Sequence, residues 1–280
     1  MANTSSINSE LFANLVVAAQ FAAYENSVAR QMVTVFDAPV NAGKILQVPV
    51  WSGISAELIT DESAATAKDT NTTSASITLG EHVVYHQVTD MLRDSSYSDV
   101  FTQIGDQSGR AIAESMDKQV FSLFTSFSTE VGPGAGGEVT VDTLLKAAAT
   151  LRSNKLTGPF YAVLHPRQAY NVKKVLTNAG ASTIPALSNV GNNVLSGFYI
   201  GNIAGIQVYE SGLVTVDGSD DAIGAVFAGS AIGHAMRGSI EMNELYLPKE
   251  RATDVVLKAV AGAAILQNSH GVKITGDAAL

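Results

Sequence analysis

The chain has 280 residues, of which 46% are hydrophobic and 15% charged, the composition of a folded protein that can bury a substantial core. Its net charge of -9 at pH 7 argues against a dedicated DNA or RNA binder, because that affinity comes mainly from lysine and arginine side chains that neutralise phosphates. The absence of cysteine excludes disulfides, thiolate zinc sites and cysteine nucleophiles.

The N-terminal residues are expected to form an arm that contains one short amphipathic helix. The run LFANLVVAAQFAA (11–23) has apolar residues at helical spacing and could pass for a signal-peptide core. No lysine or arginine precedes it, since the first positive side chain is Arg30, so a secretory signal is not expected. The later apolar stretches 222–236 and 255–266 are short, and no membrane span is expected.

Two alternating segments then predict a long hairpin. Residues 44–51 alternate with period two, and residues 75–88 continue the pattern with Val83 and Tyr85 on its apolar side. The connection DESAATAKDTNTTS (61–74) has almost no bulky apolar residue, and compact domains seldom hold so long a loop without a function for it. Because an isolated two-stranded hairpin is only marginally stable, support from a neighbouring subunit is expected.

Two helices follow the hairpin. Apolar residues recur at helical spacing over 98–127, which predicts a rod of about 45 Å that spans the subunit. GPGAGG (132–137) then breaks the chain. A second helix is predicted over 140–154, with Thr140 as its N-cap.

The second half of the chain is mostly strands. A buried strand is predicted at 160–164, and a helix follows it with Pro166 in the first position, where a missing N–H has no effect. The later strands are predicted at 199–211, 222–228, 236–247 and 252–267. Helices and strands are largely segregated along the chain, which indicates an α+β fold.

The candidate chemical motifs favour structural interpretations. GPGAGG follows a helix and lacks the Gly-Lys-Ser/Thr ending of a phosphate-binding loop, so it predicts a turn. His82 and His86 can share one strand face, but no third ligand is close in sequence and a polar face is favoured over a metal site. DGSDD (217–221) lacks the spacing of a calcium loop and predicts a hairpin turn.

The stretch LHPRQAYNVKKVL (164–176) is best interpreted as a strand-to-helix junction. His165 occupies the turn, Tyr170 is expected to face the core, and Lys173 and Lys174 are expected in the last turn of the helix, where cations are favourable. No Gly-x-Ser-x-Gly elbow occurs. No catalytic, cofactor-binding or metal site is therefore predicted.

The order of elements resembles the major capsid proteins of tailed bacteriophages (Caudoviricetes) with the HK97 fold, nearly end to end. The phrases AVLHPRQAYNV (162–172) and IGNIAGIQVYESGLV (200–214), and the two closing strands, are similar to segments of that family. The resemblance implies an N-terminal arm (1–35), an E-loop (36–90), a P-domain (91–155) with spine helix 98–127, an A-domain (156–235), and return strands to the P-domain with the C-terminal segment (236–280).

The resemblance implies assembly as the function. Pentamers and hexamers of the chain would form an icosahedral capsid around double-stranded DNA, assembled in the host cytoplasm without sequence-specific DNA contacts. The loop tip would lie over a neighbouring subunit, with Glu62, Lys68 and Asp69 as candidate intersubunit contacts. Since the arm starts at Met1, no fused scaffolding domain is expected, which implies a separate scaffolding protein unless this chain is a processed form; portal and decoration proteins are the other expected partners. A Lys–Asn cross-link from Lys44 or Lys68 is not expected.

Three alternatives stay open at this stage. An encapsulin-type nanocompartment would use the same fold to enclose enzymes. A soluble oligomeric enzyme would use His82 and His86 or the region of His165. A phage tail or adhesin subunit would form tubes or trimers.

Overall fold

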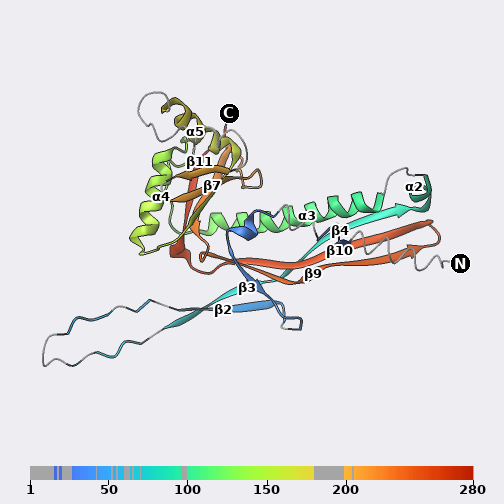
Figure 1. Cartoon of the computed structure of the whole chain (residues 1–280), viewed down its shortest axis with the longest axis horizontal. Helices are drawn as coiled ribbons and strands as arrows, with labels where there is room; N and C mark the ends of the chain where they lie inside the picture. The colour runs from blue at the N-terminus through green and yellow to red at the C-terminus, as the bar shows by residue number, and fades with distance from the viewer. Residues whose placement is uncertain are drawn as a thin grey trace.

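The computed structural model describes residues 16–17, 19–20, 27–41, 43–51, 53–54, 56–59, 64, 66–69, 71–95, 100–179, 199–203 and 205–279. The molecule is elongated, with a long helix beside long strands, a second layered unit at one end, and a hairpin that projects from the body (Figure 1). No described helix is both long enough and apolar enough to cross a membrane.

A four-stranded sheet carries the long helix. Its strand order is β1-β9-β10-β4, and β1 alone runs parallel to its neighbour. The strands are β1 (Thr34–Asp37), β4 (Gly80–Thr89), β9 (Ile232–Leu247) and β10 (Ala252–Ile265), and helix α2 (Asp90–Ser95) follows β4. Helix α3 (Val100–Ser122) packs on β10 and β4 (Figure 1). Its Ile112 and Met116 are buried against Val255 and Leu257 because apolar residues recur on that helix face.

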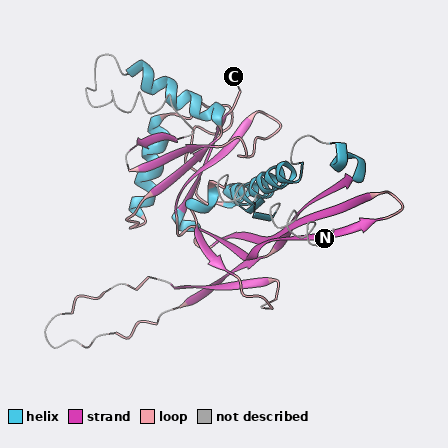
Figure 2. Cartoon of the chain, turned by 45° about the vertical axis from the view of Figure 1, so that its right-hand side comes forward, coloured by secondary structure: helices cyan, strands magenta, loops and turns pink. Residues whose placement is uncertain are grey.

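A five-stranded sheet forms the second unit, in the order β11-β8-β5-β7-β6. The strands are β5 (Phe160–Leu164), β6 (Tyr199–Ile203), β7 (Ile206–Glu210), β8 (Asp221–Ala228) and β11 (Gly271–Asp277). Helices α4 (Val141–Ser153) and α5 (Pro166–Ala179) lie beside this sheet (Figure 2). Both helices share a core with Phe160, Ala162 and Leu164, so they cover the same face. The predicted α+β class is confirmed.

The end of α3 packs on the opposite face of this second sheet. The helix predicted over 98–127 is α3, continued by a 3-10 segment, η2 (Leu123–Ser126); residues 98 and 99 lie outside the described part. Phe121 and Phe124 are buried, with ring centroids 5.4 Å apart, and Phe124 lies 5.5 Å from the ring of Phe227 on β8. Val163 joins the same core because alternate residues of β5 face opposite sides.

The third sheet is the hairpin of β2 (Ile45–Trp51) and β3 (Thr72–Thr78). The strand predicted over 75–88 was wrong as one strand, because β3 ends before Leu79 and β4 belongs to the sheet beneath α3. The change of sheet reverses the faces. Val83 and Tyr85 are therefore 51% and 55% exposed, while His82 and His86, on the other face of β4, hydrogen-bond to α3.

The N-terminal arm crosses α3 at a glycine. Residues 16, 17, 19 and 20 are helical, in agreement with the short helix predicted there. Ala19 is fully buried, and a Cβ on Gly109 would overlap its backbone. The close approach of these two backbones therefore requires glycine at position 109.

Two other short segments, η1 (Ala29–Gln31) and η4 (Asn268–His270), complete the described helical turns.

Replacing Gly109 by alanine is expected to release this part of the arm while leaving α3 intact. Alanine is the better helix former by about 1 kcal/mol, so any destabilisation must come from the displaced arm. Limited trypsin digestion should cut at Arg30, the first basic residue, faster in Gly109→Ala than in wild type. The exposed helix substitution Glu114→Ala serves as the control, and equal cleavage of all three proteins would contradict the contact.

Candidate assembly surface

The β2–β3 hairpin leaves the body of the subunit (Figures 1 and 2). No residue of β2 is buried, and in β3 only Ile77 is buried. The described residues beyond the strands, 53–54, 56–59, 64 and 66–69, are all exposed. The hairpin is therefore an arm with two strands and no core of its own.

The base of the hairpin is fixed to the long strands. Ile77 and Leu79 are buried in a small core with Ala38 and Ala235, and the N–H of Leu79 donates to the carbonyl of Lys44 over 2.9 Å. A Cβ on Gly262 of β10 would overlap the carbonyl oxygen of Thr78, so glycine permits the two strands to cross closely. The direction of the arm is thus set by packing at its root.

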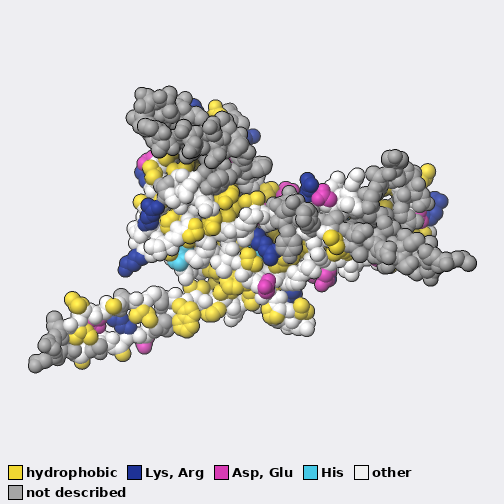
Figure 3. Space-filling model, viewed as in Figure 1, with side chains coloured by type: hydrophobic (Ala, Val, Ile, Leu, Met, Phe, Trp, Pro, Cys, Tyr) yellow, Lys and Arg dark blue, Asp and Glu magenta, His cyan; other side chains and the backbone are white. Residues whose placement is uncertain are grey.

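Large apolar side chains along the arm face solvent. Trp51 is 65% exposed and Leu58 is 97% exposed, and Ile45, Ile54 and Ile59 are also exposed. Figure 3 shows hydrophobic side chains along the projecting segment. Burying one such side chain is worth about 1.5–3 kcal/mol, so together they favour contact with another surface.

The three charged residues predicted to contact a neighbour are differently placed. Lys68 and Asp69 are exposed on the returning side of the hairpin beyond β3. Glu62 lies outside the described residues. Their roles stay predictions, as does the absence of a cross-link from Lys44 or Lys68.

His82 and His86 connect β4 to α3 through hydrogen bonds. The Nδ1 atom of His82 is 2.8 Å from Ser115 Oγ, and the Nε2 atom of His86 is 3.0 Å from Ser108 Oγ. The described residues contain no group of three or more His, Cys, Asp or Glu side chains that could hold a metal ion. The polar face predicted for these two residues is a hydrogen-bonded contact with the helix.

The glycine-rich and aspartate-rich segments are turns. In GPGAGG, Gly134 and Gly136 have positive φ, and the Gly136 N–H donates to Asp221 Oδ1 over 2.7 Å. The Asp221 carboxylate already accepts from the Gly136 N–H that a phosphate would need, and its negative charge would repel an anion. Asp217 Oδ1 accepts from the N–H groups of Ser219 and Asp221 and closes the DGSDD turn.

His165 starts helix α5 as predicted. Its Nδ1 accepts the N–H of Arg167 over 3.3 Å, and its own N–H donates to Gln168 Oε1 over 3.4 Å. These bonds satisfy groups that a helix N-terminus leaves open.

Two expectations for α5 were wrong. Tyr170 is 53% exposed, because the buried stripe of the helix passes through Ala169 and Val172. Lys173 lies before the last turn, since α5 continues to Ala179, and its Nζ pairs with Glu210 Oε2 on β7 over 2.7 Å.

Two buried titratable residues were missed by sequence reasoning. Asp117 is 4% exposed and accepts hydrogen bonds from Ser27 Oγ and from the N–H groups of Val28 and Ala29. Burial raises the pKa of its carboxyl, although these hydrogen bonds act to lower it. Burial also lowers the pKa of His234 from 6.5 to about 4, with smaller contributions from Arg30 and His82. The only sign of the buried His234 in the sequence was a single histidine within an apolar strand.

Replacing His234 by leucine is expected to reduce the loss of stability in acid. Between pH 6.5 and 4 the unfolded chain binds a proton at this position and the folded chain does not. The free energy of unfolding of the wild type therefore falls by about 3 kcal/mol through His234 as the pH falls. Asp117 acts in the opposite sense and is common to both proteins. Urea unfolding at pH 7 and pH 4.5 measures the difference, and an unchanged pH dependence in His234→Leu would contradict the buried neutral ring.

Solved capsids share this fold. The capsid of the cyanophage P-SCSP1u superposes with a TM-score of 0.65 at 18% identity and covers 87% of this chain and 86% of its own. Mycobacterium phage Che8 gives 0.63 at 15%, covering 83% and 84%, and the acidic stable capsid of Helicobacter pylori bacteriophage KHP30 gives 0.63 at 14%, covering 87% and 86%. The HK97-like capsid fold expected from the sequence is confirmed.

The family is shown by sequence as well. A family model for phage capsid proteins matches residues 72–274, and the chain belongs to that family. It is a major capsid protein, a structural component of the virion shell with no enzymatic role. The nanocompartment, soluble-enzyme and tail alternatives are not favoured. No curated protein sequence is significantly similar to the chain.

Proposed function

We propose that the chain forms pentamers and hexamers of an icosahedral shell around double-stranded DNA, with the β2–β3 hairpin lying over a neighbouring subunit. The observation that carries this is the exposed apolar arm, in which Trp51 is 65% exposed and Leu58 is 97% exposed. Aromatic residues of this kind are enriched at the centres of protein interfaces.

The domain assignment follows the sheets. In this proposal the four-stranded sheet with α3 is the P-domain, and the five-stranded sheet with α5 is the A-domain. Helix α4, which the resemblance assigned to the P-domain (91–155), goes with the A-domain because it shares a core with β5. The E-loop proper is the hairpin between β1 and β4, because β4 pairs with β10 of the P-domain sheet.

The charge of the chain fits a container. With a net charge of -9, the wall would not bind its DNA tightly, because each phosphate contact needs a cation. We propose assembly in the host cytoplasm with a separate scaffolding protein and a portal, and with a decoration protein on the finished shell. Packaged DNA in purified particles, rather than enzyme cargo, would separate this function from a nanocompartment.

Deleting residues 62–72 is expected to preserve the fold and impair shell formation. The deletion removes the polar tip, including Glu62, Lys68 and Asp69, and leaves all four cores untouched. Circular dichroism should match wild type, while sedimentation should show loss of particles. Normal particles from the deletion would refute the role given to the tip.

Trp51 provides an intrinsic probe because it is the sole tryptophan of the chain. In the unassembled subunit its side chain is 65% exposed, so its fluorescence should be red-shifted and quenched by iodide. Assembly should shift the emission to the blue and protect it from quenching. Equal quenching of free subunits and particles would contradict burial of the arm at a subunit interface.

A further inference from the structure

Strand β4 is an open edge of the four-stranded sheet. It has ten residues, more than any other edge strand in the described part of the chain, and its register with β10 continues over Gly80–Ala261 to Thr89–Ala252 without a bulge. The strand contains no proline, lysine or arginine. Proteins usually protect the unpaired N–H and C=O groups of an edge with such residues or with bulges, because a long, regular edge is a template for another strand.

The other edges of the described sheets are short, covered or interrupted. Strand β1 has four residues and β6 has five. The edge of β11 is covered where Lys273 exchanges backbone hydrogen bonds with residues 129–131. Pro49 interrupts β2, and β3 has no exposed large apolar side chain. Among the described edges, β4 alone combines an uninterrupted strand with large exposed apolar side chains, those of Val83 and Tyr85.

The described part of the N-terminal arm lies on the other side of α3. Ala19 contacts α3 at Gly109, and Gln20 Nε2 donates to the carbonyl of Ile240 on β9 over 3.3 Å. Strand β9 and strand β4 lie on opposite sides of β10. The arm residues that the structure describes are therefore placed toward β9 and leave the β4 edge uncovered.

We propose that β4 pairs with β4 of a second copy, antiparallel across a two-fold axis, so that two four-stranded sheets become one sheet of eight strands. A two-fold contact uses the same surface of both copies, and antiparallel pairing of one strand with itself has this symmetry. In the proposed shell, whose role rests on the proposed function, the pairing would join neighbouring capsomers. The pairing itself depends only on the free edge.

The side chains of β4 favour one register, with Val84 on the two-fold axis. Val83 of each copy then lies opposite Tyr85 of the other, and pairs of β-branched and aromatic residues stabilise antiparallel strands. Glu81 lies opposite Gln87, so no like charges face each other. The two Glu81 side chains are six strand residues apart, about 20 Å, and their repulsion is screened.

Helix α3 is compatible with this pairing. It runs along β4 (Figure 1) and lies above both β4 and β10, because Ser115 bonds to His82 while Ile112 packs with Leu257. With strands about 4.8 Å apart, the two α3 helices would lie about 10 Å from each other, a normal packing distance. Ala111 shares the helix face of Ser115, and both side chains are small and exposed, so the helices can approach.

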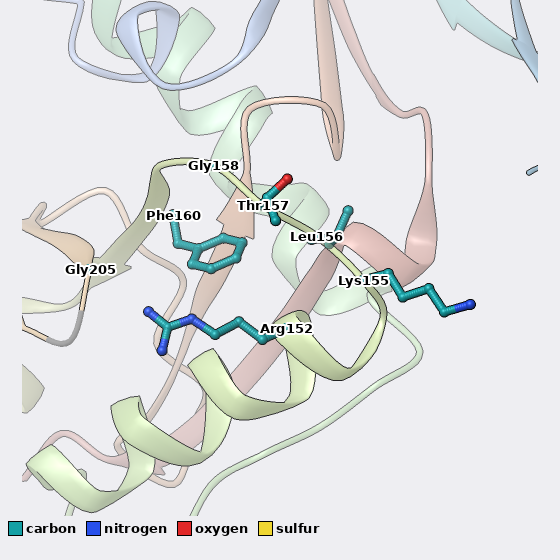
Figure 4. A pocket seen from close by; sticks show the side chains of 7 residues that line it. All are labelled: Arg152, Lys155, Leu156, Thr157, Gly158, Phe160 and Gly205. Carbon is teal, nitrogen blue, oxygen red and sulfur yellow. The ribbon is translucent and has the colours of Figure 1, made fainter.

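The pocket at the end of α4 offers no comparable contact for a second copy. Phe160 in its wall is 2% exposed and belongs to the core beneath α4. The Arg152 side chain extends past that ring toward Gly205 (Figure 4), and it already has an interaction within the chain. The walls of this pocket are used inside the subunit, whereas the edge of β4 is not.

Cysteine cross-linking tests the pairing and its register, because the chain has no cysteine of its own. Val83→Cys subunits mixed with Tyr85→Cys subunits should form a covalent dimer on mild oxidation, since directly opposite Cα atoms are about 5 Å apart and a disulfide needs less than about 7 Å. Each variant alone should give several-fold less dimer, because like positions are offset by two residues and lie about 8 Å apart. A mixture that gives no more dimer than the separate variants would overturn the pairing.

A lysine on the edge provides a second measurement that needs no thiol. Val83→Lys should lower the yield of closed shells roughly tenfold and leave unjoined capsomers, because a charged edge opposes strand pairing. Leu245→Lys is the matched control, since Leu245 is 62% exposed on the same face of the sheet but on β9, and it should assemble normally. Equal yields from the two variants would contradict the proposal.

The outcomes separate this inference from the proposed function. Shells that form although the mixed variants do not cross-link leave the capsid function standing and reject β4 as a contact. If wild type forms no shell, the proposed assembly fails, and cross-linking of the mixed subunits in concentrated solution still decides the pairing.

Discussion

The structure depends on one helix that belongs to two cores. The middle of α3 buries Ile112 and Met116 against the four-stranded sheet, and its end buries Phe121 against the five-stranded sheet. A rigid helix of 23 residues, about 34 Å long, therefore fixes the two units relative to each other. The loss of either contact would expose an apolar sheet face to water, which is unfavourable. The two units are therefore held in a fixed arrangement, and the subunit is a stiff building block for a shell.

Exposed apolar surface lies outside both cores, on the β2–β3 hairpin. The β2–β3 hairpin is anchored by Ile77 and Leu79 at its root and has no buried residue along β2. An arm of this kind is poorly stabilised alone, since two strands bury too little surface to compensate for the conformational entropy that they lose on folding. The same feature suits a shell protein, because in the proposed assembly another copy would supply the missing burial.

Much of this architecture was predictable from the sequence, and the failures have physical causes. The 3.6-residue period revealed α3, and Pro166 marked the start of α5. The switch of sheets at Leu79 was hidden, because Val83 and Tyr85 continue the apolar alternation of β3 although their face is exposed. Burial of His234 arises from neighbouring strands that are distant in sequence, and a local pattern does not report such contacts.

Electron microscopy of the expressed protein tests the central claim most directly, with and without a candidate scaffolding protein. A major capsid protein with this stiff frame and exposed arm should give closed shells, at least when the scaffolding protein is present. A monodisperse monomer or dimer under every condition would contradict the assembly of this chain into a capsid.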